Sequence, residues 1–333
     1  MRRTIRLAAI GMIGLAALGL RAAEAQTKDP DYPTRPITFY IAFSPGGNVD
    51  LATRALIRAA SKSLGQPFVP VNKVGAGGTV AGMAVMNAAP DGYTLGSYSG
   101  SAVLVIPHTP ESPYKNLNGF TLLVNYGKFI FPLIVRSDSP WKSWHDLIQW
   151  AKQNPRGVSV ATTGARSMSP MGIALWASEQ KEKVEFTHIS LKGSAEVLSY
   201  TLGGHVNLFA GSFDHAVLQS LKDGRLRILG YLSEERAPGF ESYPTFKELY
   251  GEVPPNLAGV WGPSGMPEHV LKRLDDAFAR AVKDPDFIKV MDSMSMPVVY
   301  MHRHELGSFV QQQYPKVREV MRILSAEEAK AKK

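Results

Sequence analysis

The stretch Ile37-Thr-Phe-Tyr-Ile-Ala-Phe43, followed directly by Ser44-Pro-Gly-Gly-Asn48, decides the fold. Its first part is an apolar run of strand length, and its glycine-rich part ends that run. Apolar residues at helical spacing then follow from Leu51 to Leu64. The stretch therefore predicts a strand, a loop and a helix, which is the repeating unit of α/β proteins with parallel strands.

The same unit recurs along the chain. We expect further strands at 68–72, 93–97, 158–161, 186–189, 206–210 and 226–232. We expect helices at 79–88, 169–180, 194–202, 267–282 and 305–324. Less regular segments at 107–118 and 233–255 divide these units into two sets, so the sequence predicts two α/β lobes.

The N-terminus has the pattern of a secretory signal peptide at residues 1–25. Three arginines precede an apolar run at 7–20, and Ala23-Glu-Ala25 provides the small residues of a cleavage site. The alternative is an uncleaved membrane anchor, but the run has 14 residues where a membrane span needs about 20. We therefore expect a soluble, secreted mature protein.

Composition excludes several classes of protein. The 333 residues contain no cysteine, which excludes disulfides, thiolate metal sites and cysteine nucleophiles. The content of 44% apolar and 20% charged residues is that of a globular protein with room for about two domains. Four of the 37 basic and one of the 29 acidic residues lie in 1–25, so the rest carries a net charge of +5. This mild positive charge favours small anions, and the absence of a basic block interleaved with aromatic residues predicts no nucleic-acid partner.

Three loops follow predicted strands and carry the chemical signal. They are Ser44-Pro-Gly-Gly-Asn48, Gly75-Ala-Gly-Gly-Thr79 and Ser97-Tyr-Ser-Gly-Ser101. Ligands of open α/β sheets bind at the carboxyl ends of strands, and glycine-rich helix starts present backbone N–H groups to anions. The alternative for each loop is that its glycines only shape a tight turn.

Catalytic templates fit poorly. Val80 stands where a dinucleotide-binding loop needs glycine, and Tyr98 stands where a nucleophile elbow needs serine. The order His302-Arg-His-Glu305 does not match a zinc-binding helix motif. We therefore predict no catalytic residue, no metal site and no cofactor, with a secreted α/β hydrolase using a dispersed serine site as an alternative.

Several motifs in a fixed order carry a family resemblance. They are Tyr32-Pro-Thr-Arg-Pro-Ile37, Phe43-Ser-Pro-Gly-Gly47 with Asp50, Leu64-Gly-Gln-Pro67, Gly75-Ala-Gly-Gly78, Ala89-Pro-Asp-Gly-Tyr-Thr-Leu95, Lys192-Gly-Ser-Ala195 and Leu202-Gly-Gly204. With these motifs, the chain closely resembles the Bug (TctC-like) extracytoplasmic solute receptors of tripartite tricarboxylate transporters. The resemblance covers essentially all of the chain after the signal peptide.

The resemblance implies a type II-like periplasmic binding protein. Two α/β lobes with mixed, mainly parallel sheets would be joined by a hinge of crossing strands and close on the ligand like a trap. The expected division is 26–125 and 241–333 for lobe 1 and 126–240 for lobe 2. Ligands of the family are mostly small carboxylates, and the matching first-lobe contacts are Phe43, Ser44, Gly46, Gly47, Asp50, Gly77, Gly78, Ser99 and Ser101.

The second lobe departs from the family pattern. Arg166 replaces a small residue in the loop 162–167, Pro170 stands where relatives usually have histidine, and Gly211 stands where many have aspartate. Arg166 is either a fork for a second ligand carboxylate or a solvent-facing rim residue. Lys192 is either a pocket contact or part of a helix start. The expected second-lobe contacts are Thr163, Arg166, Ser167, Lys192, Gly193 and Ser212.

The resulting hypothesis is a monomeric periplasmic receptor that delivers a small carboxylate to the membrane components of a tripartite tricarboxylate-type transporter. A diacid or an aromatic acid is favoured, since Arg166 suits a second carboxylate and the missing aspartate at Gly211 argues against an amino acid. The alternatives are a ligand sensor for a two-component system and the hydrolase described above.

Overall fold

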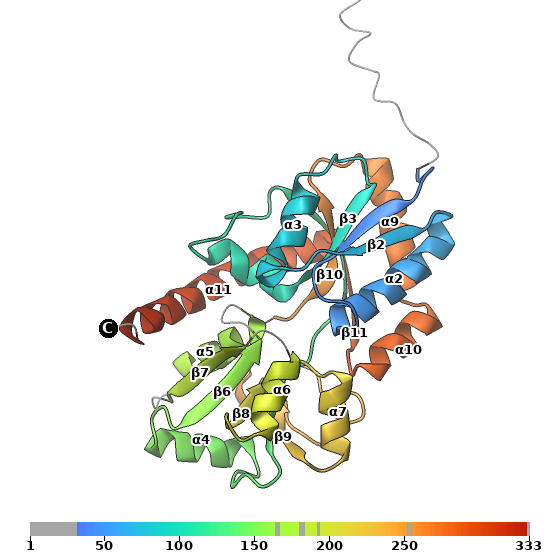
Figure 1. Ribbon diagram of the computed structural model, residues 1–333. Coiled ribbons are helices and arrows are strands. Elements are labelled where there is room, and N and C mark those ends of the chain that lie inside the picture. The colour runs from blue at the N-terminus through green and yellow to red at the C-terminus, as the bar shows by residue number, and fades with distance from the viewer. Residues whose placement is uncertain are drawn as a thin grey trace, which may run out of the picture.

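The computed structural model describes residues 32–163, 167–179, 184–191, 194–251, 253 and 255–331, and the predicted signal peptide lies outside these ranges. Within them the chain forms two β-sheets, each flanked by helices, in two lobes (Figure 1). The first sheet has the order β11 (Val298–His302), β4 (Phe120–Gly127), β10 (Ala258–Pro263), β3 (Thr94–Ser99), β1 (Ile37–Ile41) and β2 (Phe68–Asn72). The second has the order β7 (Phe186–Leu191), β6 (Val158–Thr163), β8 (Leu208–Ala210), β5 (Pro132–Arg136) and β9 (Leu226–Tyr231).

The two-lobed α/β architecture is confirmed, but strand directions differ from the prediction of mainly parallel sheets. β1 pairs in parallel with β2 and β3, and β6 pairs in parallel with β7 and β8. Every pairing made by β10, β11, β5 and β9 is antiparallel. These strands lead into or out of the segments that cross between the lobes, or return to the first sheet from the C-terminal part of the chain.

Helices cover both faces of each sheet. In lobe 1, one face packs on α2 (Asn48–Leu64) and α9 (Glu268–Ala281), while α3 (Thr79–Met86) and α11 (Arg303–Ala331) lie on the other. The remaining lobe 1 elements are the 3-10 turns η1 (Ala76–Gly78) and η3 (Ile106–His108), the π-helical turn η2 (Ser101–Val105) and α10 (Pro285–Ser293). The lobe 2 helices are α4 (Trp144–Gln153), α5 (Met168–Glu179), α6 (Ser194–Leu202), α7 (His215–Lys222) and α8 (Phe246–Tyr250).

Two crossing segments join the lobes, as the resemblance implies. β4 leads into β5 through residues 128–131, and β9 leads back to β10 through residues 232–257. Lys128 on the first segment pairs with Glu234 (2.7 Å) and Glu235 (2.8 Å) on the second. The side-chain amide of Asn256 donates to the carbonyl of Phe129, so hydrogen bonds also tie the two crossings together.

The domain limits remain a prediction, and the packing of α8 bears on one of them. Phe246 lies beyond the expected end of lobe 2 at residue 240, yet its ring is 5.1 Å from Trp144 and 5.9 Å from Trp176. All three belong to one hydrophobic core on the second sheet. Apolar burial therefore keeps α8 with lobe 2.

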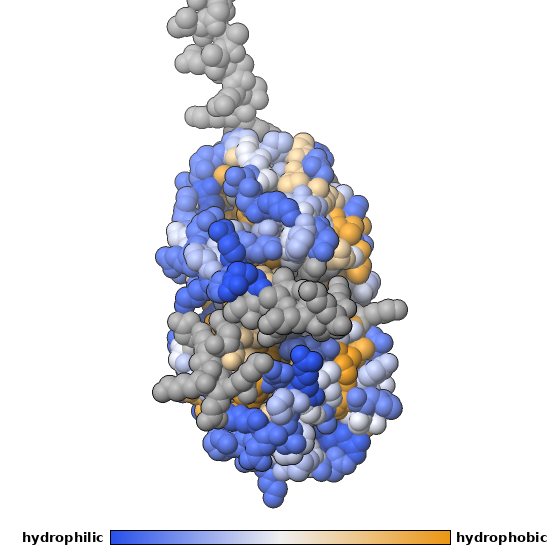
Figure 2. All heavy atoms as spheres, turned by 90° about the vertical axis from the view of Figure 1, so that its left-hand side faces the viewer, coloured by the Kyte–Doolittle hydropathy of each residue, from blue (hydrophilic) through white to orange (hydrophobic). Residues whose placement is uncertain are grey.

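Figure 2 shows one face of the molecule. It is mostly hydrophilic on both lobes, with apolar residues gathered toward one edge. None of the helices in the described ranges has the length and apolarity needed to cross a membrane.

Candidate functional site

The loop after β1 presents backbone to solvent at the start of α2. Residues 44–47 are exposed, and Gly46 has φ +79°, a left-handed conformation that glycine adopts without strain. Gly47 is the N-cap of α2 and offers no side-chain cap, and the first helical bond runs from Leu51 N–H to its carbonyl (2.9 Å). The N–H groups between the N-cap and Leu51 therefore have no acceptor within the helix, and such groups at a helix start can bind anions.

The loop after β2 has the same design. Residues 75–78 all have positive φ, and Gly78 at φ +98° is the uncapped N-cap of α3. By contrast, α4, α7, α8 and α10 begin with a side-chain cap, and α9 begins at Pro267 without one. The two helices that start at the predicted anion loops thus both leave their first N–H groups without a side-chain acceptor.

Gly78 is the point where three first-lobe loops meet. A Cβ built on Gly78 would lie 3.4 Å from the Cβ of Ala42, 3.9 Å from that of Ala102 and 4.0 Å from the ring of Phe43. These neighbours come from the ends of β1 and β3. The structure therefore brings together the predicted residues around Phe43, Gly78 and Ser101.

The end of β3 contributes hydroxyl groups. Ser99 is 8% exposed, and its Oγ has no hydrogen-bond partner within the described ranges. Ser101 is half-buried at the start of η2. Ser97 lies two residues before Ser99. Its hydroxyl oxygen accepts a hydrogen bond from the N–H of Ala42 (3.2 Å) and so joins β3 to β1. The unpartnered Ser99 hydroxyl is thus the better candidate for a ligand contact.

Asp50 lies beneath the first loop rather than on its surface. Its side chain is 3% exposed, and its Oδ2 accepts a hydrogen bond from Gly46 N–H (3.0 Å). Its Oδ1 accepts from Arg54 Nε (2.8 Å) and from Asn72 Nδ2 (2.8 Å). Burial alone would raise the pKa of Asp50, but the hydrogen bonds from Asn72, Gly46 and Arg54 hold it below its usual value. Direct ligand contact by Asp50 stays a prediction that this geometry does not favour.

In lobe 2 the described candidates lie at the corresponding strand ends. Thr163 ends β6, Ser167 directly precedes α5, and Ser212 follows β8. The hydroxyl oxygens of Ser167 and Ser169 are buried and have no hydrogen-bond partner in the described structure. Arg166, Lys192 and Gly193 lie outside the described residues.

The structure gives a steric reason for the absence of a side chain at Gly211. A Cβ at this position would lie 2.8 Å from the ring of Phe209, which is fully buried in the core of lobe 2. A side chain here would require that ring to move. The neighbouring Ser212 is therefore the polar side chain that this loop offers.

Contacts between the lobes border these loops, and sequence analysis did not identify them. Asn48, the first residue of α2, donates from Nδ2 to the carbonyl of Phe213, next to Ser212. On another side, a Cβ on Gly100 would lie 3.3 Å from Cγ of Met168 at the start of α5. The loops after β1 and β3 thus lie against lobe 2, and Figure 1 shows β6 running toward lobe 1.

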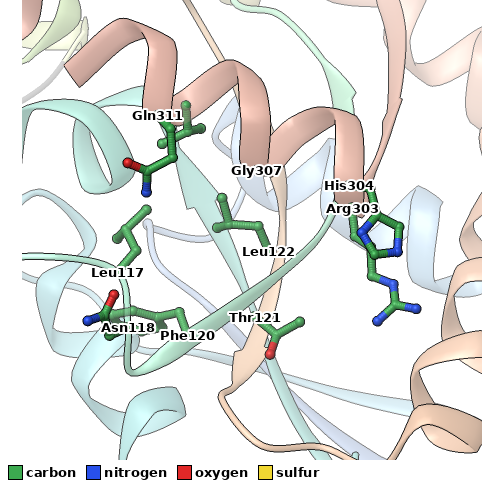
Figure 3. A pocket seen from close by; sticks show the side chains of 10 residues that line it. Leu117, Asn118, Phe120, Thr121, Leu122, Arg303, His304, Gly307 and Gln311 are labelled. Atoms are coloured by element: carbon green, nitrogen blue, oxygen red, sulfur yellow. The ribbon is translucent and has the colours of Figure 1, made fainter. Parts of the chain in front are cut away.

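A separate cavity of about 320 Å³ lies between the start of β4 and the first turns of α11 (Figure 3). Its polar lining includes Asn118, His304 and Gln311. Arg303 also lines the cavity, and its guanidinium group is already paired with Glu268 and Asp275. None of the predicted site residues lines this cavity.

Comparisons with known proteins agree with this arrangement. The family described as "Tripartite tricarboxylate transporter family receptor" (TctC) matches residues 52–325. Protein BugT of Bordetella pertussis is 34% identical over 266 residues, covering 78% of each chain. A TctC solute-binding protein from Polaromonas, solved without ligand, has a TM-score of 0.73 at 26% identity and covers 87% of this chain and 99% of its own. MatC of Rhodopseudomonas palustris, solved with bound malate, has a TM-score of 0.73 at 25% identity and covers 87% of this chain and 100% of its own.

Proposed function

The chain belongs to the TctC family of tripartite tricarboxylate transporter receptors, and from this premise we propose that it captures a small carboxylate between its lobes. A diacid or an aromatic acid is the proposed ligand. The protein would act in the periplasm and deliver this ligand to the membrane components of a tripartite tricarboxylate-type transporter. It would bind its ligand without converting it, as a receptor does.

The observation that carries the proposal is the pair of uncapped helix starts at α2 and α3. They follow the adjacent parallel strands β1 and β2, and their loops converge at Gly78. Helix N-termini without a side-chain cap attract negative charge through the N–H groups of the first turn and through their dipoles. Malate, bound by MatC, is a small acid with two carboxylates and supports this class of ligand.

The buried hydroxyl groups support a site shared by both lobes. Ser99 belongs to lobe 1, while Ser167 and Ser169 belong to lobe 2, and each hydroxyl oxygen is buried. The close approach of Gly100 to Met168 places the end of β3 next to the start of α5. Each hydrogen bond to a charged ligand contributes about 1.5–3 kcal/mol, or roughly one to two decades of affinity. A few such donors from both lobes would therefore favour closure on the ligand.

The test is calorimetric titration of residues 26–333, refolded after denaturation to remove any carried-over ligand. The panel contains malate, other aliphatic diacids, citrate, aromatic mono- and diacids, and amino acids. We expect saturable one-site binding to a diacid or an aromatic acid, with a gain of roughly 2.7 kcal/mol in stability at 100 times the dissociation constant.

A matched control separates the cleft from the cavity at α11. Gln311→Leu alters the cavity lining without touching the anion loops and should bind the selected acid as the wild type does. A refolded protein with a cooperative melting transition that binds no acid of the panel would contradict the proposed function. If Gln311→Leu folds but no longer binds the acid that the wild type binds, the acid binds in the cavity at α11 and not in the cleft.

A further inference from the structure

Three hydrogen bonds join three side chains to one another beneath the anion loop after β1, and two more tie them to its backbone. Asp50 accepts from Gly46 N–H, from Arg54 Nε and from Asn72 Nδ2. Asn72 also donates to the carbonyl of Phe43 (2.9 Å) and accepts from Arg54 through its Oδ1 (2.8 Å). Asp50 and Arg54 are one helical turn apart on α2, whereas Asn72 ends β2.

The cluster links the loop after β1 to the end of β2, the strand that leads into the second anion loop. Asn72 stands three residues before Gly75 and faces Ile41 in the register of β1 and β2. Its bond to Phe43 therefore fixes the exit of β1 against the exit of β2. Asp50 holds the exposed loop 44–47 at Gly46, whose positive φ turns its N–H toward the start of α2.

We propose that Asp50, Arg54 and Asn72 are positioning residues that hold the anion loop after β1 in its binding geometry, against the end of β2, before the ligand arrives. This inference rests on the proposed function, because it assigns a task to residues that support the same site. The three side chains bind one another, and the ligand contacts the loops above them.

The charges of the cluster fit this task. A lone carboxylate beneath an anion site would repel a carboxylate ligand and would be costly to bury. Arg54 balances Asp50 at 2.8 Å and reaches Asn72 with its second nitrogen. The cluster thus holds the loops without adding a net negative charge. A lysine at position 54 keeps the charge but has one donor group, so it cannot reach both partners in this planar geometry.

The isosteric variant Asp50→Asn separates positioning from charge. Asp50 accepts on both oxygens, so an asparagine in either orientation turns its NH₂ toward at least one donor. The variant also gains one unit of positive charge. A purely electrostatic role therefore predicts tighter binding of an anion, whereas a positioning role predicts weaker binding.

The experiment combines calorimetry with hydrogen exchange on the full mature chain, using malate and the acids of the panel above as probes. We expect Asp50→Asn to raise the dissociation constant at least tenfold and to speed amide exchange in residues 43–47 of the ligand-free protein. Arg54→Lys should give an intermediate loss, as a partial rescue. Arg58→Lys, one turn further along α2 and exposed, is the matched control and should match the wild type in both measurements.

The two readouts keep the inference separate from the proposed function. A wild type that binds no probe contradicts the proposed function, while exchange in residues 43–47 still tests the positioning role. Unchanged exchange in Asp50→Asn overturns the inference, whether or not the protein binds malate. A dissociation constant within twofold of the wild type, or lower than it, also overturns it.

Discussion

Two buried aspartates of lobe 1 stand next to arginines, yet their surroundings act on them in opposite directions. Asp50, beneath the anion loops, has a pKa below its usual value, although burial alone would raise it. Asp275, on α9 at the far end of the sheet, has a pKa raised by burial, which Arg303 and His302 only partly offset. Both side chains are almost fully buried, at 3% and 8% exposure.

Hydrogen-bond donors explain the difference. Both oxygens of Asp50 accept well-directed bonds, from a backbone amide, an arginine and an asparagine. Asp275 Oδ1 has no hydrogen-bond partner in the described part of the chain, and Arg303 Nε, at 2.9 Å from Oδ2, is poorly directed. A buried carboxylate is thus stabilised by the number and direction of its donors more than by a nearby positive charge. The cluster at the predicted ligand site is the better satisfied of the two.

The largest expected effect is on stability when Asp50 is removed. Asp50→Ala leaves the N–H of Gly46 and two side-chain donors without their acceptor. We expect a loss of about 2–3 kcal/mol in the free energy of unfolding, because charge-assisted hydrogen bonds are lost and partly buried donors remain without an acceptor. Urea denaturation of the ligand-free protein measures this. A loss below about 0.5 kcal/mol, within the range of ordinary surface changes, would break the comparison.

A smaller effect is expected in the pH dependence of stability. The pKa of Asp50 is lowered in the fold, so its stabilising contribution is present above about pH 4 and is lost as the pH falls through the folded pKa. The pKa of Asp275 is raised, so its contribution is present below about pH 4 and is lost as the pH rises through the folded pKa.

The two aspartates should therefore have opposite effects on acidification. Compared with the wild type, Asp50→Asn should lose less stability between pH 5 and about pH 3.5, and Asp275→Asn should lose more. Each slope differs by at most about 1.4 kcal/mol per pH unit. Urea denaturation at several pH values measures the slope of the unfolding free energy for each variant. If both variants differ from the wild type in the same direction, the hydrogen-bond donors do not set the pKa values of the two aspartates.

The smallest effect is expected for Asp275→Asn near neutral pH. The substitution removes a charge whose burial is only partly compensated, and Arg303 keeps Glu268 as a partner. We expect a change of less than about 1 kcal/mol in either direction. Affinity for the selected acid should not change, since the ion-pair partners of Asp275 are His302 and Arg303, at β11 and the start of α11, and neither belongs to an anion loop. A loss as large as that of Asp50→Ala would remove the distinction between the two clusters.

The sequence predicted individual elements in both lobes. The strand at 68–72 and the helix at 194–202 agree with β2 and α6 at both ends, and glycines with positive φ stand in both predicted loops, at Gly46 and at Gly78. These features depend on local apolar period and on glycine, which a short window of sequence contains. The insertion of β10 between β3 and β4 could not be predicted in this way, because it depends on the return of a distant segment.

The supporting cluster was missed for a related reason. The spacing of four residues between Asp50 and Arg54 is a signal for a helical ion pair, and it was available in the sequence. The part played by Asn72 required the register of β1 and β2, which a single sequence does not contain. The contacts of Asn48 with Phe213 and of Gly100 with Met168 depend on how the two lobes meet. Contacts between residues that are far apart in the sequence are therefore found only after the fold is known.

The central claim is that the backbone at the starts of α2 and α3 grips a carboxylate. It is tested most directly by amide NMR titration of the mature protein with the tightest acid of the panel and with its neutral amide analogue. The account predicts that the acid shifts the amide signals of Gly46, Gly47, Gly77 and Gly78, and that the amide analogue leaves them in place. Equal shifts with both compounds, or shifts confined to the α11 cavity around Gly307 and Gln311, would contradict it.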